Sequence, residues 1–460
     1  MSTSTTTAAE LARATPASRD RYVDLLRVAS LGAVILGHWL MAVVIVGPDG
    51  AVRATNALAV LPWLQPLTWL LQVMPVFFVV GGFGHATALA SGERRGATYA
   101  DFVRSRAGRL LRPTAVFVGV WLALALVIEA LGHDRGVLTI ATRVVAQPLW
   151  FVGVYLGVIA LAPTMLRLHR RLGRRAAAVP AALGVAAGTV DLCRFGGDVP
   201  YVGFLNVALV WLAVHQLGFF YADGSLRRGG RRLAFALAGG GLAATLALTV
   251  YGPYPISMVG MPGERVSNMS PPTFALFTHA IWLTGLVLLL RRPVTRWLRR
   301  PRVWPAVIAA NGFAMTAFLW HLTAMFAATA LTVGLGAVQP AVGSPAWWLL
   351  RPPWLVLLTL LTVGLVAIFQ RADRPNPRSA APTASTGVRR PAVLPTVAAA
   401  VGAALCVLGV LGISAVGFGG LLAGRTATLV VLPITPLWSA ALLTAGAGVL
   451  RATRPRSPGP

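Results

Sequence analysis

The sequence has little charge and very few acidic residues. Only 12% of its 460 residues are charged, and 13 Asp and Glu stand against 40 basic residues, every one of which is Arg. A soluble domain carries about 25% charged residues. This chain is instead 56% hydrophobic, with a mean hydropathy of +0.72. The composition excludes a soluble enzyme and a disordered protein, and it indicates a polytopic membrane protein.

Cysteine is nearly absent as well. The chain has two, Cys193 and Cys406, about two hundred residues apart. This spacing gives neither a disulfide framework nor paired metal ligands. No two His residues stand at i, i+4, the spacing with which two His on one helix bind a metal. We therefore expect no metal centre.

Long hydrophobic runs, in contrast, are abundant. Most reach the ~20 residues that a helix needs to cross a ~30 Å hydrocarbon core. We therefore predict an all-α polytopic membrane protein. Its twelve expected spans are 23–46, 63–90, 114–131, 148–166, 176–192, 200–220, 233–251, 273–290, 304–335, 347–370, 395–416 and 427–450.

The chain divides at one stretch of different composition. Residues 371–394 are rich in Pro, Arg and Ser, which predicts a flexible cytoplasmic linker. It separates a ten-helix core, 21–370, from a two-helix membrane extension, 395–450. The Ser- and Thr-rich residues 1–20 are expected to be a disordered cytoplasmic N-terminus, and 451–460 a cytoplasmic tail.

The arginines alternate between the two sides of the predicted spans. With the N-terminus inside, 33 of the 40 fall in inner segments and seven outside. This is the positive-inside pattern, and it predicts cytoplasmic termini in the plasma membrane. The net charge of +27 is thereby explained by topology, and we expect no nucleic-acid partner.

The first predicted helix carries three polar residues that a bilayer should exclude. Arg27 and His38 are 11 residues apart, so they share one face and lie roughly 16 Å apart along the axis. Asp24 precedes Arg27 by three and can pair with it. Ionisable residues inside a membrane are costly, and each is a candidate functional residue.

This spacing suits transfer of an acyl group from a cytoplasmic acyl-CoA. Arg27 can hold the donor phosphates, while the pantetheine arm extends inward to a neutral His38 that acts as general base. The ordinary alternative is a topology-setting Arg and a His that packs against a backbone carbonyl.

Five stretches in order resemble the acyltransferase-3 family of integral-membrane acyltransferases. They are the Arg-x10-His pattern Arg27–His38, "PVFFVVGGF" at Pro75–Phe83, "FVRSRAGRLLRP" at Phe102–Pro113, "PLWFVGVYL" at Pro148–Leu156 and "FLWH" at Phe318–His321. The resemblance covers roughly residues 21–370. It departs from the family pattern at Gly81, where Ser is common, so no hydroxyl role is assigned there.

The resemblance implies that an Arg-x-x-Arg pair binds the donor. Arg106, Arg109 and Arg112 stand three residues apart in turn, so a helix would place their guanidinium groups in adjacent positions. A pure topology signal is the alternative. Other candidates, for the acceptor or for support of the catalytic residue, are His85, His279, His321 and Trp150, although a lone membrane His is more often a packing residue.

Together these features predict an O-acyltransferase. Acyl-CoA, expected to be acetyl-CoA, would donate to a hydroxyl of an envelope glycan, a lipid-linked sugar or a secreted metabolite, directly or through an acyl-His38 intermediate. The alternative is a twelve-helix secondary transporter or flippase without acyl-transfer chemistry.

Overall fold

The computed structural model describes residues 8–16, 19–46, 52–132, 137–261, 264–337, 340–372 and 393–453. Most of the expected linker 371–394 and of the tail 451–460 lies outside these residues, which include only 371–372, 393–394 and 451–453 of the two segments. The fold is all-α apart from two short hairpins, as predicted. Within the first half of the chain the elements are α1 (Ala8–Arg13), α2 (Arg21–Met41), β1 (Ala42–Val46), β2 (Val52–Asn56), α3 (Ala57–Val60), η1 (Pro62–Leu67), α4 (Thr68–Leu71), α5 (Met74–Glu93), α6 (Tyr99–Ala130), α7 (Val137–Val144), α8 (Leu149–Leu172), η2 (Gly173–Arg175), α9 (Ala178–Phe195), η3 (Val202–Phe204) and α10 (Leu205–Ala222).

The second half continues with helices of similar length. It ends with a helical hairpin that carries a small two-stranded sheet in its connection. The elements are α11 (Ser225–Arg228), α12 (Gly230–Tyr251), α13 (Phe274–Trp297), α14 (Val303–Asn311), α15 (Ala314–Gly334), α16 (Pro345–Phe369), η4 (Gln370–Ala372), α17 (Val393–Val416), β3 (Ala427–Leu429), β4 (Leu432–Ile434) and α18 (Pro436–Ala452).

Eleven helical stretches among the described residues are long and apolar enough to cross a membrane, so the chain is a multi-pass membrane protein. The twelfth predicted span, 427–450, is different. Its first part forms the β3–β4 hairpin, and only the 17 residues of α18 are helical. That length is at the lower limit for a span. The total of twelve therefore stays a prediction.

Three other expectations need correction. The first span ends at Met41 rather than 46, because the β-branched run after it pairs in a β1–β2 hairpin. The long ninth segment, 304–335, is two helices that break at Gly312 and Phe313. The N-terminus was expected to be disordered, yet α1 is a helix that packs on α14.

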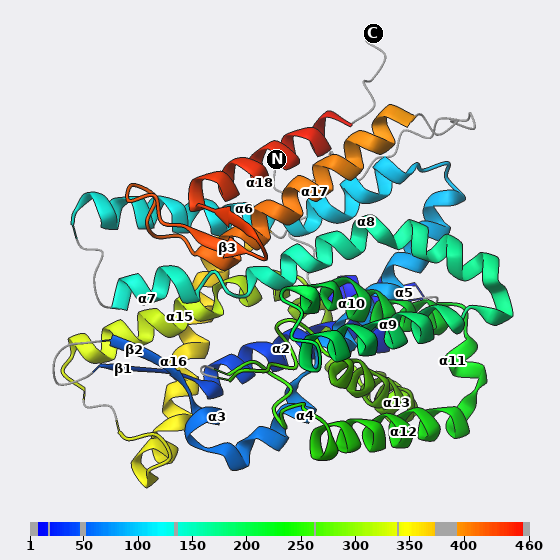
Figure 1. The fold of residues 1–460 in the computed structure, drawn as a ribbon, viewed down its shortest axis with the longest axis horizontal. Helices are drawn as coiled ribbons and strands as arrows, with labels where there is room; N and C mark the ends of the chain where they lie inside the picture. Colours follow the sequence, from blue (N-terminus) through cyan, green and yellow to red (C-terminus); the bar gives the residue numbers. More distant parts are fainter. Residues whose placement is uncertain are drawn as a thin grey trace.

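The helices lie roughly side by side along one direction (Figure 1). The α17–α18 pair packs on α6 and α8, α10 packs between α5, α8 and α9, and α12 pairs with α13. At the centre, α2 contacts both α5 and α15. Helix α2 therefore runs through the middle of the bundle, where its polar residues meet those of its neighbours.

The connection between α17 and α18 is anchored to the core by one carboxylate. Glu129, near the end of α6, accepts hydrogen bonds from the backbone N–H groups of Gly420, Leu421 and Leu422. Phe418 also donates its N–H to the Thr142 carbonyl, at 2.9 Å. Glu129 thereby joins the C-terminal extension to α6.

Two glycines let α5 and α10 approach closely. A Cβ on Gly82 would meet the His215 carbonyl oxygen, and a Cβ on Gly218 would meet the Val79 carbonyl oxygen. Small residues at such crossings allow direct backbone contact between membrane helices. This contact brings His85 of α5 beside His215 of α10.

Gly82→Ala should therefore destabilise the protein. The added methyl group has no room, and overpacking of this kind costs about 1–3 kcal/mol. Gly239→Ala, at a helical position with no heavy atom within 4 Å of the added Cβ, is the matched control. Thermal unfolding in detergent measures both, and equal midpoints for the two variants would contradict the close crossing.

Candidate functional site

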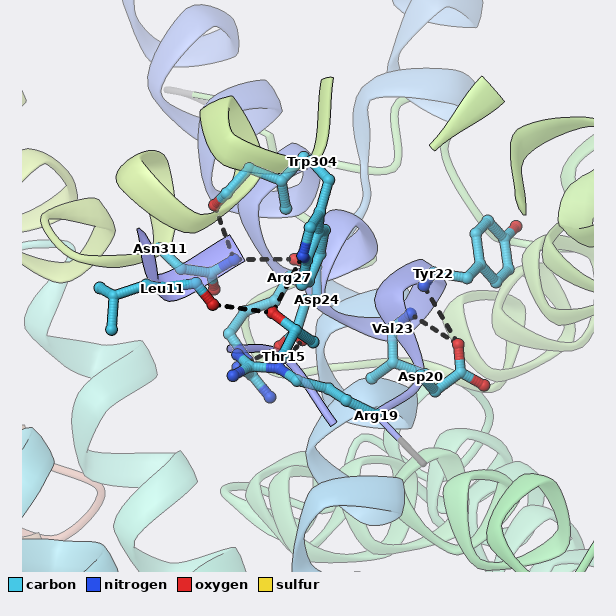
Figure 2. A network of polar contacts seen from close by, with 11 residues as sticks. Leu11, Thr15, Arg19, Asp20, Tyr22, Val23, Asp24, Arg27, Trp304 and Asn311 are labelled. Carbon is cyan, nitrogen blue, oxygen red and sulfur yellow. Dashed lines mark hydrogen bonds and ion pairs between the residues drawn. The ribbon is translucent and has the colours of Figure 1, made fainter. Parts of the chain in front are cut away.

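The start of α2 is held by a network of ion pairs and hydrogen bonds (Figure 2). The Asp24 carboxylate, 9% exposed, contacts Arg19 at 2.6 Å and Arg27 at 3.3 Å. The backbone carbonyl of Asp24 accepts a hydrogen bond from Asn311 of α14, at 3.3 Å. Asp20 caps the helix through the N–H groups of Tyr22 and Val23. The predicted Asp24–Arg27 pair is therefore present. The contacts with Arg19 and Asn311 and the helix cap at Asp20 hold it in position.

Arg27 lies in a group of like charges. Arg106 and Arg109, from the first half of α6, interact electrostatically with Arg27 and with each other. All three also act on the hydroxyl of Tyr155 from α8. We call Arg27, Arg106 and Arg109 the arginine cluster. Arg112, one turn further on, is not among the charges acting on Tyr155.

Few acidic side chains balance the positive charge of the arginine cluster. Neither Arg106 nor Arg109 belongs to an ion pair with a described residue, whereas their neighbour Arg104 pairs with Asp101 at 2.6 Å. Arg27 and Arg106 are partly buried, whereas Arg109 is exposed. Mutual repulsion among cations in a partly buried place is costly unless an anion offsets it. The cluster is thus suited to hold an anionic ligand.

His38 meets a partner that sequence spacing alone did not reveal. Its Nδ1 lies 2.7 Å from Nε2 of His321 on α15. The two rings are nearly coplanar, with an interplanar angle of 10°. His321 is fully buried, while His38 is only partly so. His321, proposed from sequence only as a candidate supporting residue, is the direct partner of His38.

The surroundings of the pair assign its protons. Nδ1 of His321 contacts the Phe318 carbonyl, which can only accept a hydrogen bond, so this nitrogen carries the proton. Nε2 of neutral His321 is then an acceptor, and Nδ1 of His38 must donate to it. The remaining nitrogen of His38, Nε2, keeps its lone pair. That is the form that a general base needs.

The aromatic motifs pack around this pair. Phe77 of α5 and Phe318 of α15 both contact Phe151 of α8, with ring centroids 5.0 and 5.4 Å away. Phe318 in turn lies 5.8 Å from the ring of His321. Three of the sequence stretches quoted above therefore meet at one place. Trp150 lies beside them, 6.1 Å from Trp211.

The other candidate histidines lie apart from this pair. Nδ1 of His85 is 2.9 Å from Nε2 of His215, which makes a second histidine pair, and the arginine cluster acts on His85 electrostatically. His279 is fully buried between Trp69 and Trp282. Its Nε2 also lies 3.4 Å from the Gln72 carbonyl oxygen, and its suggested role toward the acceptor stays a prediction. No group of three or more His, Cys, Asp or Glu within the described ranges could hold a metal ion.

Sequence reasoning missed Tyr155 altogether. Its hydroxyl lies over Gly81, where a Cβ would be only 2.6 Å from the hydroxyl oxygen. The position that commonly holds Ser in the resembled family is thus covered by a phenol hydroxyl from another helix. The motif "PLWFVGVYL" contained this tyrosine, but nothing in the spacing connected it with Gly81 or with the arginines.

These features define a multi-pass membrane protein with an arginine cluster shared by α2 and α6 and a histidine pair shared by α2 and α15. A model of the acyltransferase-3 family, described as an acyltransferase domain, matches residues 20–371. The chain belongs to this family and is a membrane acyltransferase, which confirms the resemblance. Searches of curated proteins and of solved structures gave no match.

The His38–His321 contact should appear as an energetic coupling. Polar bonds between membrane helices average about 0.6 kcal/mol and reach about 1.7 kcal/mol. We expect this coupling in a double-mutant cycle of His38→Ala and His321→Ala. The loss of unfolding free energy in the double variant should be smaller than the sum of the losses in the two single variants by about this amount. A cycle between His38 and His169, which bonds to Asp223 instead, should be additive. Additivity in both cycles, measured by unfolding in detergent, would contradict the pair.

Proposed function

We propose that the protein is an acyl-CoA-dependent O-acyltransferase of the plasma membrane. The donor, acetyl-CoA in the simplest case, binds from the cytoplasm at the arginine cluster. Its acyl group passes to a hydroxyl of an envelope glycan, a lipid-linked sugar or a secreted metabolite. The observation that carries the proposal is the His38–His321 pair, because it leaves an available base on the helix that also carries Arg27.

The proposed binding of the donor rests on the charge of the arginine cluster and on the distance between Arg27 and His38. Coenzyme A carries phosphates, and Arg side chains form strong charge-assisted bonds with them. Arg106 and Arg109 form no ion pair with a described acidic residue, although Nε of Arg109 donates to the Ser105 carbonyl at 3.4 Å. Helix α2 is unbroken between Arg27 and His38, a rise of roughly 16 Å. A pantetheine arm can span this distance and bring the thioester to the imidazole.

The chemical step uses Nε2 of His38. This nitrogen takes the proton of the acceptor hydroxyl as the hydroxyl oxygen attacks the thioester carbonyl carbon and a C–O bond forms. The tetrahedral intermediate then collapses with cleavage of the C–S bond. The leaving thiolate takes the proton back from His38. The products are the ester and the free thiol of coenzyme A.

His321 acts as a positioning residue in this step. Its Nε2 accepts the Nδ1 proton of His38, and the Phe318 carbonyl fixes its own ring. This arrangement orients the His38 ring and stabilises the imidazolium that forms, as a carboxylate does in a catalytic triad. With the N-terminus inside, the base lies between a cytoplasmic donor and an acceptor on the opposite side. A transporter without acyl transfer would leave the histidine pair and the arginine cluster unexplained.

The arginine cluster provides the first kinetic test. Replacing Arg106 and Arg109 together by Gln should raise the KM for acetyl-CoA well over tenfold. Each lost charge-assisted bond is worth about 1.5–3 kcal/mol, and every 1.4 kcal/mol is a factor of ten. Arg104→Gln, which removes an Arg already paired with Asp101, is the control. An unchanged KM in correctly inserted protein would mean that both residues only set the membrane topology and do not bind the donor.

The histidine pair provides the second kinetic test. His38→Gln should abolish transfer of label from acetyl-CoA while leaving insertion and donor binding near those of the wild type, because general-base catalysis contributes about 10²–10⁴ in rate. His321→Leu should lower kcat strongly with little change in the donor KM, and His321→Gln, which can still accept a hydrogen bond, should recover part of it. His169→Gln is the control. Full turnover by the His38 variant would refute the mechanism.

A further inference from the structure

A cavity lies just beyond the histidine pair along α2 and α15. It has a volume of about 390 Å³, and Ala42 and Met325 are among the residues that line it. Each of these follows one of the paired histidines, His38 and His321, by four residues. The cavity therefore begins about one helical turn from the base, on the side away from Arg27.

The wall of the cavity is mostly apolar, with one cation. Helix α16 contributes Trp347, Leu350, Arg351 and Trp354. The Arg351 guanidinium lies over the Trp347 ring, with its Cζ atom 4.1 Å from the ring centroid. Stacking on an indole orients a guanidinium and leaves its N–H donors for other partners.

Two donors in this wall have no partner among the described residues. They are Nε of Arg351 and Nε1 of Trp347, both buried, and the Trp347 side chain is only 3% exposed. The described ion pairs do not include Arg351. The nearby Thr329 hydroxyl is already used, because it donates to the Met325 carbonyl.

A cation with an orphaned buried N–H needs a counter-charge. Burying a charged or polar donor without a partner costs free energy, and that cost is removed when an anion accepts the bonds. A carboxylate or phosphate matches the forked donors of Arg. The apolar remainder of the cavity matches a hydrocarbon portion of the same molecule.

We propose that this cavity binds the acyl acceptor, and that the acceptor is an amphiphile whose carboxylate or phosphate pairs with Arg351 while its apolar part fills the cavity. This rests on the proposed function, since it needs the acceptor hydroxyl to reach Nε2 of His38. It also narrows the acceptor, because a neutral sugar would leave Arg351 without a counter-charge and a purely water-soluble metabolite would leave the apolar wall unfilled.

Equilibrium binding to purified protein in a neutral detergent tests the site without any enzymatic activity. The probes are labelled dodecanoate, dodecanol and inorganic phosphate. Dodecanoate should bind most tightly, and Arg351→Gln should weaken it at least tenfold while leaving dodecanol unchanged. Trp347→Phe, which keeps a ring but removes the N–H, should weaken dodecanoate by a smaller factor. Arg143→Gln, a change at an exposed Arg of α7, is the control.

Two binding results would overturn the proposal. One is dodecanoate binding that is the same in wild type and in Arg351→Gln. The other is inorganic phosphate binding as tightly as dodecanoate, which would mean that the apolar wall contributes nothing.

The product of the reaction gives an independent readout. Membranes containing the wild-type protein and labelled acetyl-CoA should form a product that partitions into organic solvent and is retained by an anion exchanger. Dodecanoate should inhibit formation of this product competitively in the wild type but not in Arg351→Gln. A neutral or water-soluble product overturns the proposal while His38-dependent transfer stands. No His38-dependent product at all, with Arg351-dependent dodecanoate binding intact, refutes the proposed function and with it the acceptor role of the cavity.

Discussion

The hydrogen bond between His38 and His321 is the interaction on which the site depends. In a membrane interior there is no water to satisfy a polar side chain, so each imidazole nitrogen must find a partner within the protein. Phe318 supplies a carbonyl to His321, and His321 supplies a lone pair to His38. The chain of bonds ends there, which leaves one nitrogen of His38 without an assigned partner. A polar pair that joins α2 to α15 therefore also leaves Nε2 of His38 in the form that the proposed base catalysis needs.

The arginine cluster works by the opposite principle. In the histidine pair one ring satisfies the other, whereas Arg106 and Arg109 repel each other and Arg27 and form no ion pair with a described residue. The sequence contains few acids, and those near the cluster are already committed, Asp24 to Arg19 and Arg27, and Asp101 to Arg104. A fold that concentrates cations in this way gains most when a polyanion binds. The same shortage of acidic residues that indicated a membrane protein leaves Arg106 and Arg109 without an ion-pair partner among the described residues.

The sequence predicted what depends on local periodicity, and it failed where contacts join distant segments. The spacing of Arg27 and His38 on one helix and the Asp24–Arg27 pair follow from the 3.6-residue repeat, and the structure contains both. The hairpin after Met41 and the break at Gly312 were missed because hydropathy does not distinguish an apolar strand or a bent helix from a straight span. Tyr155 over Gly81, and His321 against His38, could not be found by spacing, since each contact joins helices far apart in the chain.

Helix α2 sets the order of these elements along the bundle. Its first turns carry Asp24 and Arg27 beside the cations of α6, its last turns carry His38 against α15, and the chain leaves it at Ala42 beside the cavity that holds Arg351. The arginine cluster thus lies at one end of α2 and Arg351 at the other. The His38–His321 pair, which packs against phenylalanine rings, lies between them. A helix has a fixed rise of 1.5 Å per residue, so these three places cannot shift relative to one another without unfolding α2. Two substrates that enter from opposite ends of such a helix would meet at His38, because it is the only titratable side chain on α2 between Arg27 and Met41.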